Sequence, residues 1–195
     1  MEYYQKLIDA AAPYQDKRSD WGHAKITLSY AVLLLKLERA DPNVVIPAII
    51  LHDIGWSQLS EEERTLLFDV NVSKQKKLEM RIKHQEEGIR LAKKILEEIE
   101  YPIILHPHIL EIISQHDTRK GFFSPEDGIT RDADKLWRCS SIGFKADLNR
   151  SPNYSFEEEY EKVRQENEQE GFFYSESAKK IAKQELSDRL LEYKK

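Results

Sequence analysis

Residues 44–57, "VVIPAIILHDIGWS", constrain the fold of this chain more than any other stretch. The run is apolar enough to lie in a core, yet it leads directly into an adjacent imidazole and carboxylate, His52 and Asp53. Burying such polar side chains without partners costs several kcal/mol. We therefore expect this pair either to cap a helix or to bind a metal.

The spacing of apolar residues predicts an all-α fold. Only 7 Gly and 7 Pro interrupt the 195 residues, and apolar side chains recur every three or four positions instead of alternating. Ser60 with Glu63 and Ser155 with Glu158 match the capping-box pattern of a helix start. About eight or nine helices are expected, over residues 2–12, 20–40, 44–53, 61–68, 74–99, 108–117, 129–148, 156–170 and 176–193.

Composition restricts the class of partner. The formal net charge is -5, from 30 Lys and Arg and 35 Asp and Glu, and both signs are mixed along the chain. This mixture argues against binding to nucleic acid or to a membrane surface, and favours a small-molecule partner. Cys139 is the only cysteine, and the N-terminal residues lack the pattern of a signal peptide, so we expect a cytoplasmic protein. A homo-oligomer is left open.

Two histidines are expected to point into the core. His23 shares a helix face with Ile26 and Tyr30, three and seven positions later. His116 follows Ile109, Ile112 and Ile113 on one apolar stripe. In contrast, His106 and His108 flank Pro107 at a helix start, where we expect them to be solvated.

Two further polar residues stand out inside predicted helices. His84 precedes Gly88 by about one turn, and a glycine there costs about 1 kcal/mol of helix propensity, so we expect it to permit a close approach beside the histidine. Asp134 lies between Ile129 and Trp137, where aspartate has poor helix propensity and is too far from the loop for a routine cap.

Each of these features alone has an ordinary explanation. A single inward histidine is more often a core residue, and the His-Asp dipeptide recurs at His116 and Asp117, which shows how readily chance supplies one. Their conjunction is more informative, because four of the six histidines and two aspartates lie on or beside apolar stripes of five predicted helices. A divalent metal would satisfy all of these buried groups, and imidazole with carboxylate suits iron, manganese, zinc or nickel.

The order His23, then His52 and Asp53 within "IILHDIG", then Asp134 within "DADKLW", resembles the H…HD…D signature of the HD superfamily of metal-dependent phosphohydrolases. The resemblance covers roughly residues 20–145. It implies an HD-domain-like helical bundle in which these four residues bind a divalent metal, and hydrolysis of a phosphate ester or anhydride, often of a nucleotide. We expect residues 1–150 to form the HD-type domain and residues 151–195 to form a helical extension packed on it.

The resemblance also suggests a second metal. His84 and His116 fall where HD proteins with a binuclear centre place two further ligands, so Asp53 would bridge two ions. Iron or manganese is then the first choice, with zinc, nickel, cobalt and magnesium as alternatives. In a one-metal enzyme, His84 and His116 would instead contact the substrate phosphate.

Cations are needed to balance the charge of a phosphorylated substrate. The nearest in sequence to the expected ligands are Arg119, Lys120, Lys135 and Arg138. Arg138 is one turn from Asp134, so holding that ligand in place and a plain ion pair are equally open.

Asp53 is expected to take part in catalysis as a metal ligand, and Asp117 or Glu87 could accept a proton as a general base. One departure from the family is clear. Many members continue "HDIGK", with a lysine near the phosphate, whereas this chain has Trp56 at that position. The phosphate contact must come from another residue, or the substrate differs.

The leading hypothesis is a phosphohydrolase that acts on a small phosphate ester or nucleotide through a metal-activated water. One alternative is a diiron oxygenase, because a few HD proteins with six such ligands resemble inositol oxygenase. Another is a non-catalytic helical protein that binds a metal or a nucleotide. Residues 118–127 join two ligand-bearing helices and are expected as a lid, with residues 171–177 as the weaker candidate.

Overall fold

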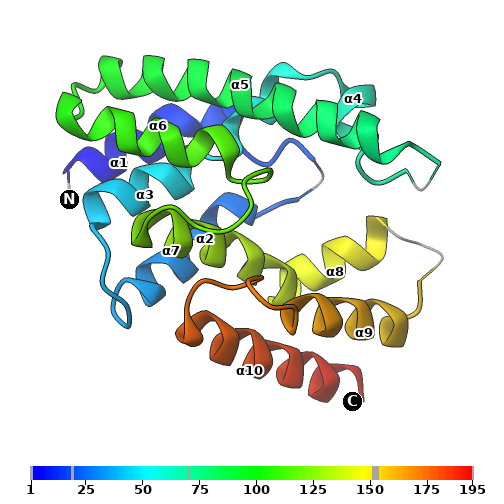
Figure 1. The fold of residues 1–195 in the computed structure, drawn as a ribbon. Helices are drawn as coiled ribbons and strands as arrows, with labels where there is room; N and C mark the ends of the chain where they lie inside the picture. Colours follow the sequence, from blue (N-terminus) through cyan, green and yellow to red (C-terminus); the bar gives the residue numbers. More distant parts are fainter. Residues whose placement is uncertain (1, 19, 70, 151–153, 195) are drawn as a thin grey trace. The chain divides into compact units, whose positions relative to one another are not determined.

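The computed structural model describes residues 2–18, 20–69, 71–150 and 154–194 (Figure 1). Over this part of the chain it contains ten α-helices and four short 3-10 segments, and no strand. The predicted all-α fold is confirmed. The chain forms two compact units, the first from residues 1–19 and 41–120 and the second from residues 20–40 and 121–195.

The first unit is built around helix α3, whose residues from Val44 to Leu51 are all buried. Helix α3 contacts α1 and α6, and the long helix α5 contacts α6 and the 3-10 segment η2. The elements of this unit are α1 (Glu2–Ala11), η1 (Ala12–Tyr14), α3 (Pro42–Leu51), η2 (Ile54–Gln58), α4 (Glu61–Thr65), α5 (Lys74–Glu98), η3 (Ile103–Leu105) and α6 (His106–Gln115).

Helix α3 tolerates a proline in its interior because another side chain replaces the missing hydrogen bond. Asp41 caps the helix by accepting from the Asn43 backbone N–H. Pro47 has no N–H to donate to the Asn43 carbonyl, four residues earlier. That carbonyl instead accepts from the Tyr101 hydroxyl at 2.8 Å. The apolar run that leads to His52 therefore stays helical through Pro47.

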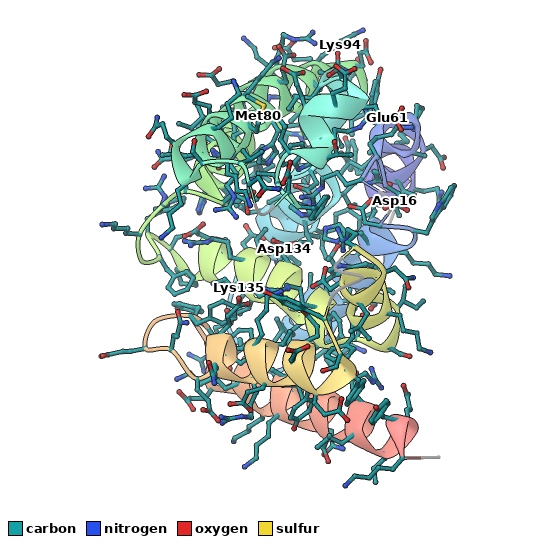
Figure 2. All side chains as sticks on the ribbon, turned by 90° about the vertical axis from the view of Figure 1, so that its right-hand side faces the viewer. Asp16, Glu61, Met80, Lys94, Asp134 and Lys135 are labelled. Atoms are coloured by element: carbon teal, nitrogen blue, oxygen red, sulfur yellow. The ribbon has the colours of Figure 1, made fainter. Side chains whose placement is uncertain are left out.

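The segment that follows His52 and Asp53 packs against α5. Trp56, Leu59 and Met80 form a buried cluster, in which Met80 comes from α5 (Figure 2). Gly55 is required at this contact, because a Cβ there would lie 1.9 Å from the His84 carbonyl oxygen. The two elements can meet at this distance only without a side chain.

The second unit contains α2 (His23–Leu34), α7 (Pro125–Leu136), η4 (Trp137–Cys139), α8 (Ser141–Arg150), α9 (Phe156–Asn167) and α10 (Glu176–Tyr193). Helix α2 packs on α7, and α10 contacts α7, η4 and α9. The predicted capping boxes of Ser60 and Ser155 are both present, at the starts of α4 and α9. A domain boundary at residue 150 stays a prediction.

The single helix predicted over residues 129–148 is wrong. The chain leaves the helix at Ser140, whose backbone is extended with φ -65° and ψ 156°. The Ser140 hydroxyl then accepts from the Gly143 N–H at 3.0 Å and so caps α8. Gly143 has no room for a side chain, since a Cβ would lie 1.9 Å from the Trp137 carbonyl oxygen.

The described helices include none that is both long and apolar enough to cross a membrane.

Candidate metal centre

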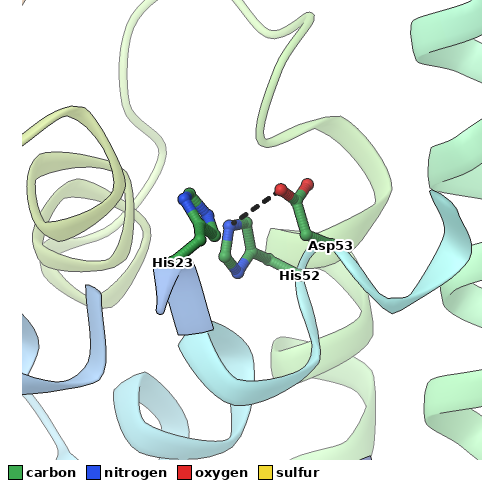
Figure 3. A group of neighbouring side chains, drawn as sticks. All are labelled: His23, His52 and Asp53. Carbon is green, nitrogen blue, oxygen red and sulfur yellow. Dashed lines mark ion pairs between the residues drawn. The ribbon is translucent and has the colours of Figure 1, made fainter. Parts of the chain in front are cut away.

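His52 and Asp53 directly follow α3, and the local backbone sets the orientation of the imidazole. His52 Nδ1 lies 2.8 Å from the Ile49 carbonyl oxygen. A carbonyl can only accept, so Nδ1 carries the proton and Nε2 presents its lone pair. Nε2 lies 3.7 Å from Asp53 Oδ2, the contact drawn in Figure 3. This arrangement is typical of a metal-binding histidine.

His116 repeats the same geometry at the end of α6. Its Nδ1 lies 2.9 Å from the Ile113 carbonyl oxygen, so its Nε2 also presents a lone pair. That nitrogen lies 3.3 Å from His84 Nε2 and 3.4 Å from Asp53 Oδ1. The second His-Asp pair of the sequence therefore joins the first in one cluster of the first unit.

His84 supplies a third imidazole from within α5 and is fully buried. Its Nε2 lies 3.7 Å from Asp53 Oδ1 and 3.6 Å from Asp117 Oδ2. Burial lowers the pKa of His84 to about 3, although the charge of Asp117 opposes the shift, so the ring is neutral at neutral pH. A neutral imidazole is the form that binds a metal.

Asp53, His84 and His116 fit a divalent metal ion. Their ligand atoms all lie within 4.8 Å of one another. Nitrogen and oxygen ligands about 2.0–2.2 Å from a tetrahedral ion are about 3.4 Å apart. The distances of 3.3, 3.4 and 3.7 Å among these three side chains match that separation. The donor set of two imidazoles and a carboxylate suits iron, manganese or zinc.

The two oxygens of Asp53 face different partners. Oδ1 faces His84 and His116, at 3.7 and 3.4 Å, whereas Oδ2 faces His52 at 3.7 Å. A carboxylate that bridges two ions with one oxygen on each divides its oxygens in this way. The geometry of Asp53 therefore fits the predicted bridging role.

Sequence reasoning missed two side chains that hold Asp53. Arg18 follows η1, and its Nη2 donates to Asp53 Oδ2 at 2.5 Å. Trp56 Nε1 donates to Asp53 Oδ1 at 3.1 Å. The Trp56 ring also stacks on His84, with centroids 4.0 Å apart and planes 10° apart. The departure from "HDIGK" at Trp56 was the available signal, whereas Arg18 lies in a segment without periodicity.

A close approach of two backbones was predicted at Gly88, but the glycine that it requires is mainly Gly55. A Cβ at Gly88 would make ordinary contacts, the nearest at 3.5 Å. A Cβ at Gly55 would lie 2.5 Å from the Gly88 backbone nitrogen and closer still to the His84 carbonyl oxygen. Helix α5 does approach closely beside His84, but the constraint lies on the partner segment η2.

The second unit holds another expected ligand pair. His23 is the first residue of α2 and is buried, as predicted. Its Nε2 lies 3.3 Å from Asp134 Oδ1 on α7, and its ring meets the edge of Trp137 at 5.0 Å. Asp134 is labelled on α7 in Figure 2. The structure thus pairs the first and last residues of the H…HD…D order within one unit.

Asp132, two residues before Asp134, has a different environment. Its carboxylate accepts from the Tyr174 and Ser175 backbone N–H groups at 2.7 and 2.8 Å, and from the Ser175 hydroxyl at 2.8 Å. Burial nevertheless raises its pKa. These bonds fix the segment that leads into α10, and so they oppose the prediction of a lid at residues 171–177.

Lys135 is held by the same segment. Its Nζ donates to the Phe172 carbonyl and lies 4.9 and 4.8 Å from the ring centroids of Phe122 and Phe172. Burial lowers its pKa to about 8. Phe122 belongs to the predicted lid of residues 118–127, so part of that loop also packs on α7.

The other predicted substrate cations differ in their surroundings. Arg119 pairs with Glu111, and Lys120 is exposed. Arg138 is paired with three carboxylates of the second unit, from Asp147, Glu159 and Glu166. Arg138 is therefore engaged in an ion-pair network with α8 and α9.

Asp117 lies in the cluster of the first unit and Glu87 pairs elsewhere. Gln85, buried next to His84, accepts from the Asp117 backbone N–H at 3.2 Å and so positions that residue. Glu87 pairs with Arg90 at 2.9 Å on the surface. Of the two predicted proton acceptors, Asp117 is the one beside the imidazoles.

His106 corrects one prediction. It is buried rather than solvated, and its Nε2 bonds the Tyr101 carbonyl oxygen at 2.9 Å. A cavity of about 470 Å³ in the second unit, lined by Phe144, Leu148 and Phe156 among others, contains none of the predicted metal ligands.

Comparison with protein-family models identifies the family of this chain. A model of the HD domain matches residues 21–138, more than half of the chain. Neither the curated proteins nor the solved structures contain a significant match. The matched range includes every expected ligand, from His23 to Asp134. The chain belongs to the HD domain family, which is part of the superfamily of metal-dependent phosphohydrolases.

Proposed function

We propose that this protein hydrolyses a small phosphate ester or a nucleotide through a metal-activated water. The observation that carries the proposal is the convergence of His84 Nε2, His116 Nε2 and Asp53 Oδ1 at separations of 3.3–3.7 Å. Family membership supports the reaction class. The substrate follows from the resemblance and from the charge pattern, which favours a small molecule.

We assign the ligands to two ions. The resemblance implies that His23, His52, Asp53 and Asp134 would hold one ion, and that His84 and His116 would hold the second, with Asp53 shared. The division of the Asp53 oxygens between His52 on one side and His84 and His116 on the other supports this sharing. Iron or manganese is the proposed metal.

A divalent ion, when bound, would supply a water with a pKa of about 7 and would polarise a phosphoryl oxygen. The chain's own residues prepare the site for this chemistry. The Nδ1–H bonds of His52 and His116 to the Ile49 and Ile113 carbonyls hold both rings with Nε2 forward. Their orientation is set before any ligand binds, which lowers the cost of assembling the site.

Asp117 is the proposed proton acceptor. Its carboxylate is 3.6 Å from His84 Nε2, and its backbone is held by Gln85. Arg119 and Lys120 lie two and three residues after it, so they are candidates for contact with the substrate. Lys135 and Arg138 are engaged with Phe172 and with three carboxylates, which makes them the weaker candidates.

The test is phosphate release by untagged protein loaded anaerobically with Fe²⁺ or Mn²⁺, using p-nitrophenyl phosphate and a panel of nucleoside mono-, di- and triphosphates. Hydrolysis should require metal and should fall about 100-fold or more in Asp53→Asn, because the shared ligand is weakened. His106→Gln is the matched control, since His106 is a buried histidine outside the cluster. Control activity should persist.

Two results would replace the proposal. Oxygen uptake by the iron-loaded protein, without phosphate release from any substrate, would favour the diiron oxygenase, which needs the same six side chains. A melting temperature that rises with metal, with neither reaction, would favour a non-catalytic metal-binding protein.

A further inference from the structure

The replacement of the "HDIGK" lysine by Trp56 leaves the site without its expected phosphate-binding cation. The structure places another cation beside the Trp56 side chain. The Arg18 guanidinium lies 4.6 Å from the Trp56 ring centroid and pairs with Asp53 Oδ2 at 2.5 Å. A cation therefore lies at the cluster, although it comes from a segment 35 residues earlier in the chain than Asp53.

Trp56 connects this cation to the metal ligands. Its ring stacks on His84 at 4.0 Å, and its Nε1–H donates to Asp53 Oδ1. The buried indole of Trp56 thus contacts both the Arg18 guanidinium and the His84 imidazole. A rigid indole can hold the guanidinium in place through a cation–π contact.

Arg18 can exchange its contact with the Asp53 carboxylate for a contact with a phosphate of the substrate when Asp53 binds a metal. When a carboxylate coordinates metal cations, its negative charge is partly neutralised and it attracts a neighbouring guanidinium less strongly. The cation–π contact of Arg18 with Trp56 does not depend on that charge. Arginine presents several donors in a plane that matches the oxygens of a phosphate. The Arg18 side chain is also 15% exposed, so an incoming anion can reach it.

We propose that Arg18, held against the face of Trp56, binds an anionic oxygen of the substrate at the metal centre. This inference rests on the proposed function and names the residue that replaces the absent lysine. Trp56 is a positioning residue in this arrangement, and Arg18 contacts the substrate.

The test measures binding of inorganic phosphate to Mn²⁺-loaded protein by calorimetry, alongside metal content. Arg18→Gln should weaken phosphate binding about tenfold or more while the protein keeps its metal, since the variant loses the charge-assisted hydrogen bonds to the phosphate oxygens. Arg18→Lys should recover part of the loss. Arg90→Gln is the matched control, because Arg90 is an exposed arginine of the first unit that pairs with Glu87.

Trp56 variants test whether the Trp56 ring positions Arg18 for phosphate binding. Trp56→Phe keeps an aromatic face and should bind phosphate within about threefold of the wild-type protein, whereas Trp56→Leu should lose about as much as Arg18→Gln. Comparing KM and kcat for any substrate found adds a second measure, because Arg18→Gln should act mainly on KM.

Failure of this inference is distinguishable from failure of the proposed function. Wild-type binding of phosphate that depends on Arg18, without hydrolysis of any substrate, would uphold the inference and overturn the function. Equal phosphate affinity in the metal-loaded wild type and Arg18→Gln would overturn the inference, whether or not the protein hydrolyses phosphates. The inference also fails if Arg18→Gln loses metal and its loaded fraction binds phosphate as the wild type does.

Discussion

His84 Nε2 and His116 Nε2 lie 3.3 Å apart, although the two residues are 32 positions apart in the sequence. His116 Nε2 presents a lone pair because its Nδ1–H is bonded to a carbonyl, and burial keeps His84 uncharged. Two imidazole nitrogens this close need a proton or a cation between them. This contact is the main structural argument for a metal in the first unit.

His116→Gln should therefore remove one of two bound ions. Calorimetric titration of the metal-free protein with Mn²⁺ should show about two sites in the wild type and about one in the variant, because a single imidazole and Asp53 hold an ion weakly. His106→Gln should keep both sites. Two sites of unchanged affinity in His116→Gln would show that His84 and His116 are not ligands, and would favour their contact with the substrate.

Substitution of Asp132 and Asp134, which lie two residues apart on α7, should affect different properties of the protein, stability in one case and metal content in the other. Asp132→Asn should lower the free energy of unfolding by about 2–3 kcal/mol, because it disrupts charged hydrogen bonds to the start of α10. Asp134→Asn should instead lower metal content, with a smaller effect on the metal-free protein. Urea unfolding and metal analysis of both variants measure these effects, and a reversed pattern would contradict the assigned roles.

Replacing Gly55 and Gly88, which both lie near His84, by alanine should distinguish a steric clash from a gain in helix propensity, through their effects on stability. Gly55→Ala should destabilise the protein by about 3 kcal/mol or more, because its Cβ would overlap the His84 carbonyl oxygen. Gly88→Ala has room and replaces glycine within a helix, so it should be neutral or stabilising by up to about 1 kcal/mol. Thermal unfolding of both variants tests the comparison; similar losses would refute the packing described at η2.

The buried thiol of Cys139 should make stability fall at alkaline pH. Burial raises the pKa of Cys139 from 9.0 to about 11. The unfolded state then releases its proton first, so this contribution to stability is present below pH 9 and is lost as the pH rises towards 11. Cys139→Ala should show less of this loss in denaturant titrations, and a thiol reagent at pH 8 should react with Cys139 only after unfolding.

Much of the fold could be predicted because its signals are local. Ser60 and Ser155 cap their helices through neighbours three residues away, and His23 and His116 are buried on the faces that their apolar neighbours predict. The order His23, His52 with Asp53, and Asp134 along the sequence predicted the HD family, which the family match confirms. The break at Ser140 was missed because the cap lies inside an uninterrupted helical pattern of apolar residues.

Other features depend on contacts between distant segments. Arg18 joins Asp53 across 35 residues, and Asp132 joins Ser175 across 43, and no periodic pattern encodes either pairing. His106 looked like a solvated residue because Pro107 marks a helix start, but the Tyr101 carbonyl provides it with a buried partner. Each unit also combines two separate segments of the chain, and the spacing of apolar residues within one segment does not indicate which other segment it packs with.

The most direct test of the account is the metal content of untagged protein after anaerobic loading with Fe²⁺ or Mn²⁺, measured by inductively coupled plasma mass spectrometry beside Asp53→Asn. We predict about two ions per chain in the wild-type protein and a large loss in the variant, since Asp53 is the shared ligand. Wild-type protein that remains empty after loading would contradict the metal centre and with it the proposed hydrolysis.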